Sequence, residues 1–349
     1  MIPAPSALEK LTVNGRSSPS RVERPGLLSR PMARNLTSAD ATNVTRACLG
    51  SICGPDGPTD EQLRILNSIA THFWELPSVD LSPDQAFSAE ESAAAITDER
   101  LRRRTRELMV LLEMCRHPLE PAHEQRVEDY CHALGGDGPG IELTRNYVSK
   151  GADAAIADWL RRFTEKAPEM MEPLMIELSQ ISEDDAEGQA AAARTFAELE
   201  TALRSAAPGT LGAEFVSFYD RNGFTIGPES IPLMGHDMAH VIGGYDATPI
   251  GEICIGAMKL MTTDSDIHWL EFLGNVMIHE TGLTPDGYKE HESALKTPEN
   301  IELLVQAMSR GRETTIDFSN GDHLSMINWP IEDVRAHYGV PALNSGGTT

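Results

Sequence analysis

Apolar side chains recur at three- and four-residue spacing along most of the chain from about residue 60, which is typical of amphipathic helices. The pattern predicts a first helix capped by Asp60, with apolar positions Leu63, Leu66, Ile69 and Phe73. Further helices are expected over 99–116, through Val127 and Tyr130, and over about 140–150, 152–166, 168–181 and 184–205. The five residues from Thr314 to Phe318 are the only stretch that alternates like a strand. The predicted fold class is therefore all-α, built from packed helices.

The 349 residues exceed the usual size of one domain, so two helical domains are expected. Residues 1–45 are rich in Ser, Pro and Arg without a hydrophobic period, which predicts a flexible tail. We place one helical domain at 46–195 and a second at 196–349. The boundary is drawn near the acidic run at 182–185 and the break at Pro208 and Gly209.

The formal charge of −24 argues against nucleic acid and against purely electrostatic docking on anionic lipid. The sequence has no apolar run long enough to span a membrane, and its start does not resemble a secretory signal. A mitochondrial transit peptide stays open as an alternative for the Arg- and Ser-rich start. Five scattered cysteines do not form a disulfide framework and are expected to be reduced. We expect a cytoplasmic protein.

A metal-site pattern starts at His236, where the sequence reads His-Asp-Met-Ala-His, and ends at Glu252, with eleven residues between His240 and Glu252. Histidines four apart lie on one face of a helix. Gly243 and Gly244 predict the end of that helix, and Thr248 with Pro249 predicts the start of the next. A short turn between the two helices can bring Glu252 back toward the imidazoles. Imidazole nitrogens with carboxylate oxygens suit one divalent ion, and Zn, Fe, Mn and Co are not distinguished.

Other interpretations of these residues stay open. Glu252 can be part of a helix cap, although it follows Thr248 by four residues rather than the three of a capping box. Asp237 is either a direct ligand or an acceptor that orients a histidine. The histidines themselves can be satisfied core residues. The nearby residues His268, Glu271, Asn275 and His279 can form a polar wall of the metal pocket or the solvent face of a helix.

The segment from His236 to Ile253 resembles the coenzyme Q biosynthesis protein 4 family, whose hallmark is His-Asp-x-x-His, eleven residues and Glu. The matching positions are His236, Asp237, His240, Gly244, Gly251, Glu252 and Ile253. Weaker resemblance extends over roughly residues 200–342 and includes Gly209–Gly212, Phe218, Asn222–Phe224, Ser309–Gly311 and Pro330–Arg335. Residues 60–165 are similar to the TerB-like helical domains of tellurite-resistance proteins, most visibly at Met114–Pro118 and His132–Gly135.

The resemblance implies a helical, often dimeric protein that acts on the prenylated aromatic ring of a ubiquinone precursor. The implied activity is metal-dependent loss of a ring carboxyl, which in the oxidative form is replaced by hydroxyl. His236, Asp237, His240 and Glu252 match the family's metal-binding positions, so they are the predicted catalytic and metal-binding residues. The implied partners are a prenylated aromatic or lipid-like molecule, other quinone-biosynthesis proteins and a peripheral contact with the inner membrane.

The sequence departs from the family in two places. Residues 231–235 replace a stretch that commonly contains Tyr and Arg, and Gly256 stands where a Lys is often found, although Lys259 is near. A different aromatic or lipid-like acid is therefore an alternative substrate. A second hypothesis is a non-catalytic lipid-binding scaffold of a quinone biosynthetic complex. A hydrolase analogous to the HExxH zinc proteases is the third, and Asp237 in place of Glu counts against it.

Overall fold

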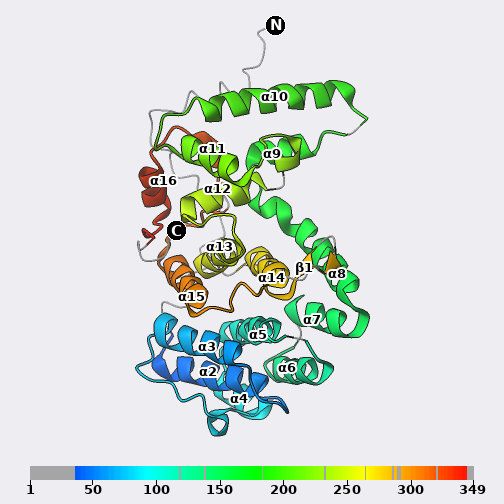
Figure 1. Ribbon diagram of the computed structural model, residues 1–349, viewed down its shortest axis with the longest axis vertical. Coiled ribbons are helices and arrows are strands. Elements are labelled where there is room, and N and C mark those ends of the chain that lie inside the picture. The colour runs from blue at the N-terminus through cyan, green and yellow to red at the C-terminus, as the bar shows by residue number, and fades with distance from the viewer. Residues whose placement is uncertain are drawn as a thin grey trace. The chain divides into compact units, whose positions relative to one another are not determined.

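We describe a computed structural model of the chain over residues 36–343, except 118, 137–138, 183, 232, 264, 285–286, 289–291 and 320. The described residues are almost entirely helical, and the strands among them are two residues each, so the predicted all-α class is confirmed. The fold divides into two compact units (Figure 1). We call residues 166–247 and 313–343 the small unit, and residues 36–165 and 248–312 the large unit.

The large unit takes its helices from both ends of the described chain. Its N-terminal elements are α2 (Ser38–Ile52), α3 (Asp60–Ser68), the π-helical turn Ile69–Phe73, the 3-10 turn Pro83–Gln85, α4 (Ala89–Ala95), α5 (Glu99–Met114), α6 (Pro121–Ala133), α7 (Pro139–Lys150) and α8 (Ala152–Lys166). Its later elements are α13 (Pro249–Thr262), α14 (Asp266–Thr281), the hairpin β1 (Leu283–Thr284) and β2 (Gly287–Tyr288), and α15 (Pro298–Glu313). Segments distant in sequence therefore build one body.

The main apolar cluster of the large unit has α14 packed against α5, α7 and α13, and a small second cluster is formed by Ala41, Ala70 and Leu76. Trp159 of α8 packs on α14 at Gly274, where an added Cβ would come within 2.1 Å of the indole. The indole nitrogen of Trp159 donates a hydrogen bond of 2.8 Å to the Leu270 carbonyl oxygen. The glycine therefore allows the ring to lie directly on the α14 backbone.

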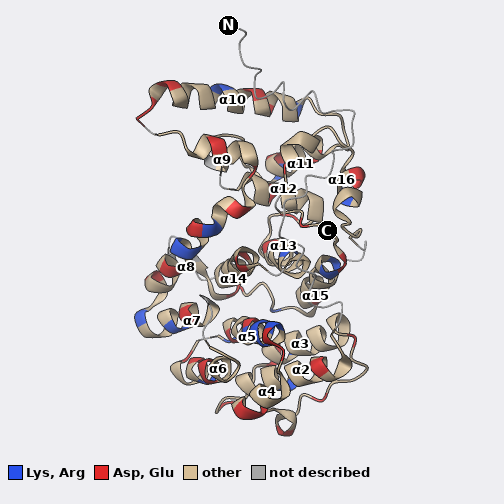
Figure 2. Ribbon diagram, turned by 180° about the vertical axis from the view of Figure 1, so that it is seen from behind, with Lys and Arg blue, Asp and Glu red and all other residues tan. Residues whose placement is uncertain are grey.

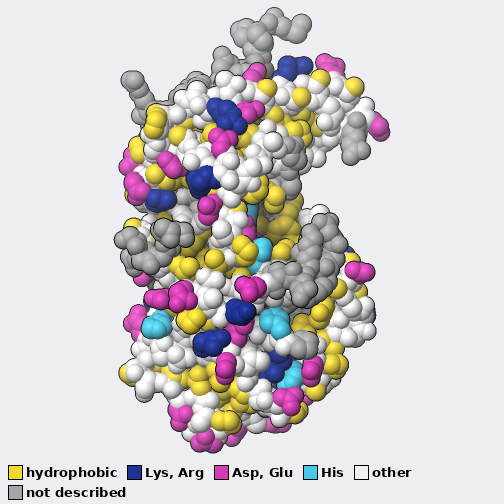
Figure 3. Space-filling view, viewed as in Figure 1, with side chains coloured by type: hydrophobic (Ala, Val, Ile, Leu, Met, Phe, Trp, Pro, Cys, Tyr) yellow, Lys and Arg dark blue, Asp and Glu magenta, His cyan; other side chains and the backbone are white. Residues whose placement is uncertain are grey.

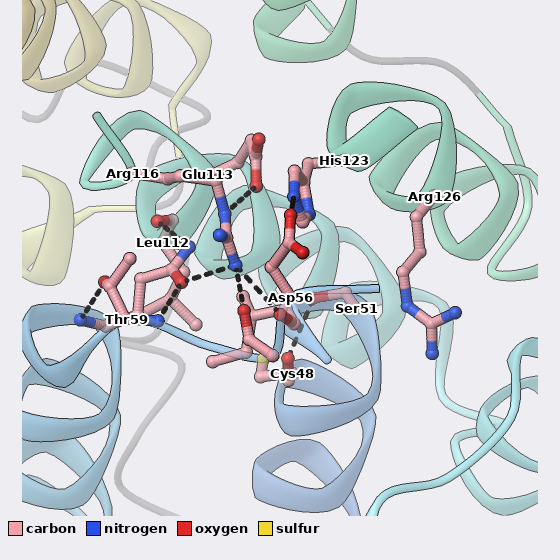
Figure 4. A network of polar contacts seen from close by, with 12 residues as sticks. Cys48, Ser51, Asp56, Thr59, Leu112, Glu113, Arg116, His123 and Arg126 are labelled. Atoms are coloured by element: carbon pink, nitrogen blue, oxygen red, sulfur yellow. Dashed lines mark hydrogen bonds and ion pairs between the residues drawn. The ribbon is translucent and has the colours of Figure 1, made fainter. Parts of the chain in front are cut away.

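Several arginines of the large unit donate hydrogen bonds to backbone carbonyls of other segments of the unit. The ribbon of Figure 2 marks basic residues on α5 in blue. On this helix, Arg102 donates to the Ile96 carbonyl and Arg106 to that of Leu134. Arg116, after α5, donates to the carbonyls of Ile52 and Gly57 (Figure 4). On the face drawn in Figure 3, acidic side chains are scattered over the surface with basic ones among them. This arrangement offers no basic surface for a phosphate backbone on that face.

The small unit holds α9 (Pro173–Ser179), α10 (Ala186–Arg204), α11 (Leu211–Asn222), α12 (Met234–Gly243) and α16 (Ile331–Tyr338). Its 3-10 turns are Ala167–Met170, Pro228–Ser230 and His323–Met326. Helix α11 packs against α10, α12 and α16, and its buried face carries Phe215, Phe218 and Tyr219. A buried pair of His323 and Glu172 links the last of these turns to the start of α9. Helix α12 is thus held among packed neighbours.

Several expectations are changed by local capping. Helix α2 begins at Ser38, inside the segment predicted as a flexible tail, because Thr37 and Asp40 form a capping box. Helix α3 is capped by Thr59 with Gln62, so Asp60 is its first helical residue rather than its cap. The stretch from Thr314 to Phe318 is not a strand. Residues 1–35 of the predicted tail lie outside the described residues.

The predicted domain boundary near residue 195 lies within α10, and the division of the chain into domains at 46–195 and 196–349 stays a prediction. Among the helices of the described residues, none combines the length and the apolar content that crossing a bilayer requires.

Candidate metal centre

Helix α12 carries three of the four predicted site residues: His236, Asp237 and His240. It ends as predicted, because Gly244 takes the left-handed conformation (φ 78°) and donates its N–H to the His240 carbonyl at 2.7 Å. At the other end, a Cβ on Gly235 would come within 2.5 Å of the Met170 carbonyl oxygen. The residue before His236 is therefore a glycine at a close approach of two backbones.

The two histidines face each other on one side of α12. Their Nε2 atoms are 3.0 Å apart, and His240 is fully buried whereas His236 is partly exposed. Two nitrogens at bond lengths of about 2.0–2.1 Å from one ion lie about 2.9–3.4 Å apart for cis-octahedral to tetrahedral angles. The observed separation falls in that range, which is also the distance of a hydrogen bond between the two rings.

The tautomer of His240 follows from its second nitrogen. Nδ1 lies 3.1 Å from the carbonyl oxygen of Tyr245, which can only accept, so Nδ1 carries the proton in this hydrogen bond. In the neutral ring this leaves a lone pair on Nε2, the atom that faces His236. Phe218 stacks on the imidazole with ring centroids 5.4 Å apart and an interplanar angle of 25°. The ring of His240 is therefore fixed in both tautomer and orientation.

Asp237 is held by a residue that the sequence patterns did not single out. The hydroxyl of Tyr219 on α11 donates to Oδ2 of Asp237 at 2.6 Å, and both side chains are buried. A buried tyrosine hydroxyl needs a hydrogen-bond partner, which is the one signal that could have indicated it. Asp237 thus has an acceptor oxygen fixed by α11, which suits both of the roles predicted for it.

The C-terminal end of α12 is clamped by Arg335 of α16. Its Nε donates to the Ile242 carbonyl at 3.0 Å and its terminal nitrogen to that of Val241 at 3.1 Å. These carbonyls belong to the last turn, whose acceptors lack partners within the helix. Arg335 belongs to the stretch of weaker family resemblance, where the sequence indicated no role for it. Its contacts with the last turn of α12 make it a positioning residue for the histidine helix.

Glu252 lies in the large unit, in the first turns of α13. The predicted start of that helix is confirmed, since the Thr248 side chain accepts from Gly251 N at 3.2 Å and Pro249 is the first helical residue. Asn275 of α14 donates to the Glu252 carbonyl at 2.7 Å. The structure thus brings His236, Asp237 and His240 together on one helix. That Glu252 joins them stays a prediction.

The polar residues of α14 do not form a solvent face, so that interpretation is wrong. His268 and Glu271 are buried, and Glu271 accepts an ion-paired hydrogen bond of 2.5 Å from fully buried Lys259. Helix α14 is covered on most of its circumference by α5, α7 and α13, which leaves its polar side chains inside the unit. The alternative, a polar wall toward the metal, stays a prediction.

The large unit also contains an apolar pocket of about 450 Å³, counting the space open to solvent. Its lining is mainly aromatic and aliphatic, with Arg104 and Glu107 as the charged members, and includes Phe73, Leu108, Leu260 and Phe272. The apolar lining, rather than the volume, resembles that of sites for small apolar ligands.

Comparisons with known proteins give little beyond these observations. No protein-family model matches the chain, and no curated protein matches it. A crystal structure from Nostoc punctiforme, named as a candidate ubiquinone biosynthesis protein, is similar with 19% identity and a TM-score of 0.31. The similarity covers 68% of this chain and 99% of that one. A likeness this low carries no argument about function, so the chain is assigned to no family.

Proposed function

We propose that His236, Asp237, His240 and Glu252 bind one divalent metal ion, and that the site removes the carboxyl group of a prenylated aromatic or similar lipid-like acid. The observation that carries the proposal is the Nε2–Nε2 separation of 3.0 Å between two oriented imidazoles. The donor set fits a borderline divalent cation, because it combines two nitrogens with carboxylate oxygens.

Glu252 is the proposed fourth ligand because it lies in the first turn of α13, the helix that follows α12 in the chain. Only residues 244–248 separate the two helices, and each residue spans at most about 3.5 Å. Asn275 fixes the Glu252 backbone through its carbonyl oxygen. The side chain is partly exposed, which leaves it able to turn toward an ion.

The roles of the chain's own residues follow from their contacts. His240 supplies a lone pair from a ring that Tyr245 and Phe218 hold in place. Tyr219 donates to Asp237 and so orients its carboxyl group beside the histidines. When bound, the ion would supply a Lewis acid that stabilises the negative charge left on the ring as CO₂ departs, and a proton from solvent would then replace the carboxyl group.

The proposal is tested by metal content and by turnover of a prenylated 4-hydroxybenzoate. The purified chain should hold about one metal at this site, and the double variant His240→Ala/Glu252→Ala should lose it together with CO₂ release. His337→Ala, which removes an exposed histidine of α16, is the matched control and should retain both. A metal content in the double variant that is no lower than in the natural chain would exclude this site.

A lipid-binding scaffold is the second candidate, and the apolar pocket of the large unit favours it. Complementation of a quinone-deficient strain separates the two functions. A scaffold keeps its function in Glu252→Gln when the variant is folded, whereas an enzyme with Glu252 as a ligand loses it.

A further inference from the structure

A second group of metal-type donors lies in the large unit, where three distant segments meet. Glu61 is in the first turn of α3, His117 follows α5, and Glu280 is in the last turn of α14. One donor atom from each residue lies within 4.8 Å of the other two. The group is independent of α12 and of the proposed function.

Glu280 is the fixed member of the group. It is buried, and its Oε1 accepts hydrogen bonds from Leu295 N at 2.6 Å and from the Ser293 hydroxyl at 2.7 Å. The His117 Nε2 lies 3.8 Å from Oε2 of the same carboxylate. Arg116 holds the segment that carries His117 through the carbonyls of Ile52 and Gly57 (Figure 4). The imidazole and the buried carboxylate are therefore positioned by the fold.

The carboxylates of Glu61 and Glu280 carry more negative charge than the positively charged groups around them compensate. The Ser293 hydroxyl lies within hydrogen-bond distance of Glu61 (3.2 Å) and of both Glu280 oxygens, although it has only one proton to donate. Among the described residues, no lysine or arginine forms an ion pair with either carboxylate. Even with His117 protonated, two ionised carboxylates leave an uncompensated negative charge in a mostly buried place.

We propose that Glu61, His117 and Glu280 bind a second divalent cation, of the zinc type, that links α3, the α5–α6 connection and α14. One imidazole nitrogen and two carboxylates form a mixed donor set that suits zinc and cobalt. Bonds of about 2.0–2.2 Å require donors about 3.3 Å apart, which side-chain rotation can reach from the observed spacing. The side chain of His117 is 38% exposed, which provides an entry path and an open fourth position.

Another three-donor group, formed by Asp56, Glu120 and His123, is less suited to an ion. The Asp56 side chain is 80% exposed, and Glu120 is exposed as well. Solvated carboxylates lose more hydration on binding a cation and are held less rigidly than Glu280. The comparison favours the group at Glu61.

The experiment uses the full chain with His236→Ala/His240→Ala, so that only the second site is counted. Zn²⁺ and Co²⁺ are titrated calorimetrically, and the melting temperature and the visible Co²⁺ spectrum are followed. One equivalent should bind, raise the melting temperature and give the d–d bands of low-coordinate cobalt. The variants Glu61→Gln and His117→Ala should each abolish the stoichiometric binding and the thermal shift.

Asp60→Asn is the matched control, because it removes one charge at the same end of α3 from an exposed side chain. It should bind metal as the parent does. Glu61→Gln also relieves carboxylate repulsion, so it should remain folded and keeps the test interpretable. The proposal is overturned if the folded parent binds no stoichiometric Zn²⁺ or Co²⁺, or if Glu61→Gln and His117→Ala leave binding unchanged. Because α12 is already disabled, its own failure to bind metal cannot produce either result.

Discussion

The Tyr219 hydroxyl donates a hydrogen bond of 2.6 Å to Oδ2 of Asp237, and so joins α11 to the helix that carries both histidines. The bond is charge-assisted and buried, so it is stronger than an exposed one. It fixes the carboxylate next to His236 before any ion is present.

Tyr219→Phe should therefore weaken Zn²⁺ binding at the proposed α12 site by about 10- to 100-fold, the usual effect of removing a partner that orients a ligand. It should also lower the free energy of unfolding by about 1–3 kcal/mol, because Asp237 keeps its burial and loses a donor. Competition titration with a chelator and urea unfolding measure the two effects. Tyr147→Phe, in the large unit, is the control, and an unchanged affinity in Tyr219→Phe would exclude the orienting role.

Arg335→Met should destabilise the small unit by about 1–3 kcal/mol, because it removes the donors to the Val241 and Ile242 carbonyls while it keeps the length of the side chain. The same variant should weaken metal binding through the loosened end of α12. Urea unfolding and metal titration test both statements. Arg221→Met, which removes an exposed arginine of α11, should change neither, and equal effects of the two variants would contradict the clamp.

The buried pair of His323 and Glu172 predicts a pH dependence. His323 Nε2 donates to the Phe318 carbonyl at 2.7 Å and Nδ1 faces Glu172, so both ring nitrogens carry protons. Burial alone lowers the pKa of His323, but the charge and hydrogen bond of Glu172 outweigh it, and the net pKa is raised. The folded state therefore holds this proton more tightly than the unfolded state.

The resulting stability is complete below about pH 6.5, the unfolded pKa, and is lost as the pH rises through the folded value. Urea midpoints between pH 7 and 9, measured with a chelator present, should fall with pH in the natural chain. The fall should be smaller in Glu172→Gln, which removes the charge that raises the pKa. A natural chain with a flat profile over this range would contradict the assignment.

Glu113→Gln should stabilise the large unit at pH 8. Burial, opposed by Arg116 and reinforced by Glu124, raises the pKa of Glu113 to about 7, and its oxygens have no hydrogen-bond partner among the described residues. A raised carboxyl pKa gives stability below about pH 4.5 that disappears as the pH rises through about 7. The neutral amide avoids this loss, so the gain at pH 8 is at most about 3 kcal/mol.

Thermal unfolding of the Glu113→Gln variant and the natural chain at pH 5 and pH 8 measures this gain. The difference should be small at the lower pH and larger at the higher one. Glu120→Gln, which neutralises an exposed carboxylate on the same connection, should give no such difference. A stabilisation that does not depend on pH would contradict ionisation as its cause.

The sequence predicts helices and their ends well where the signals are local. The stop at Gly244 and the start at Thr248 depend on glycine geometry and side-chain capping, which are properties of a few adjacent residues. The same local rules account for the position of both histidines on one face of α12.

Contacts between distant segments were not predictable in this way. Tyr219 and Arg335 reach α12 from other helices, and hydrophobic periodicity says nothing about which helices become neighbours. The burial of His268 and Glu271 was missed for a related reason, since α14 is mostly buried although its pattern is partly polar. The partner Lys259 belongs to α13 and satisfies Glu271 only once the helices pack.

The contact between Trp159 and Gly274 restricts where α8 can pack on α14. No side chain larger than hydrogen fits at position 274 while the indole keeps its bond to the Leu270 carbonyl. Helix α8 therefore has one packing position along α14 and cannot shift to a neighbouring turn. The chain leaves the large unit at the end of α8 and enters residues 166–247 of the small unit, which contain both histidines. The point in the large unit from which this segment starts is therefore fixed. Mutations within residues 166–247 can accumulate without shifting the position of α8, where the segment begins.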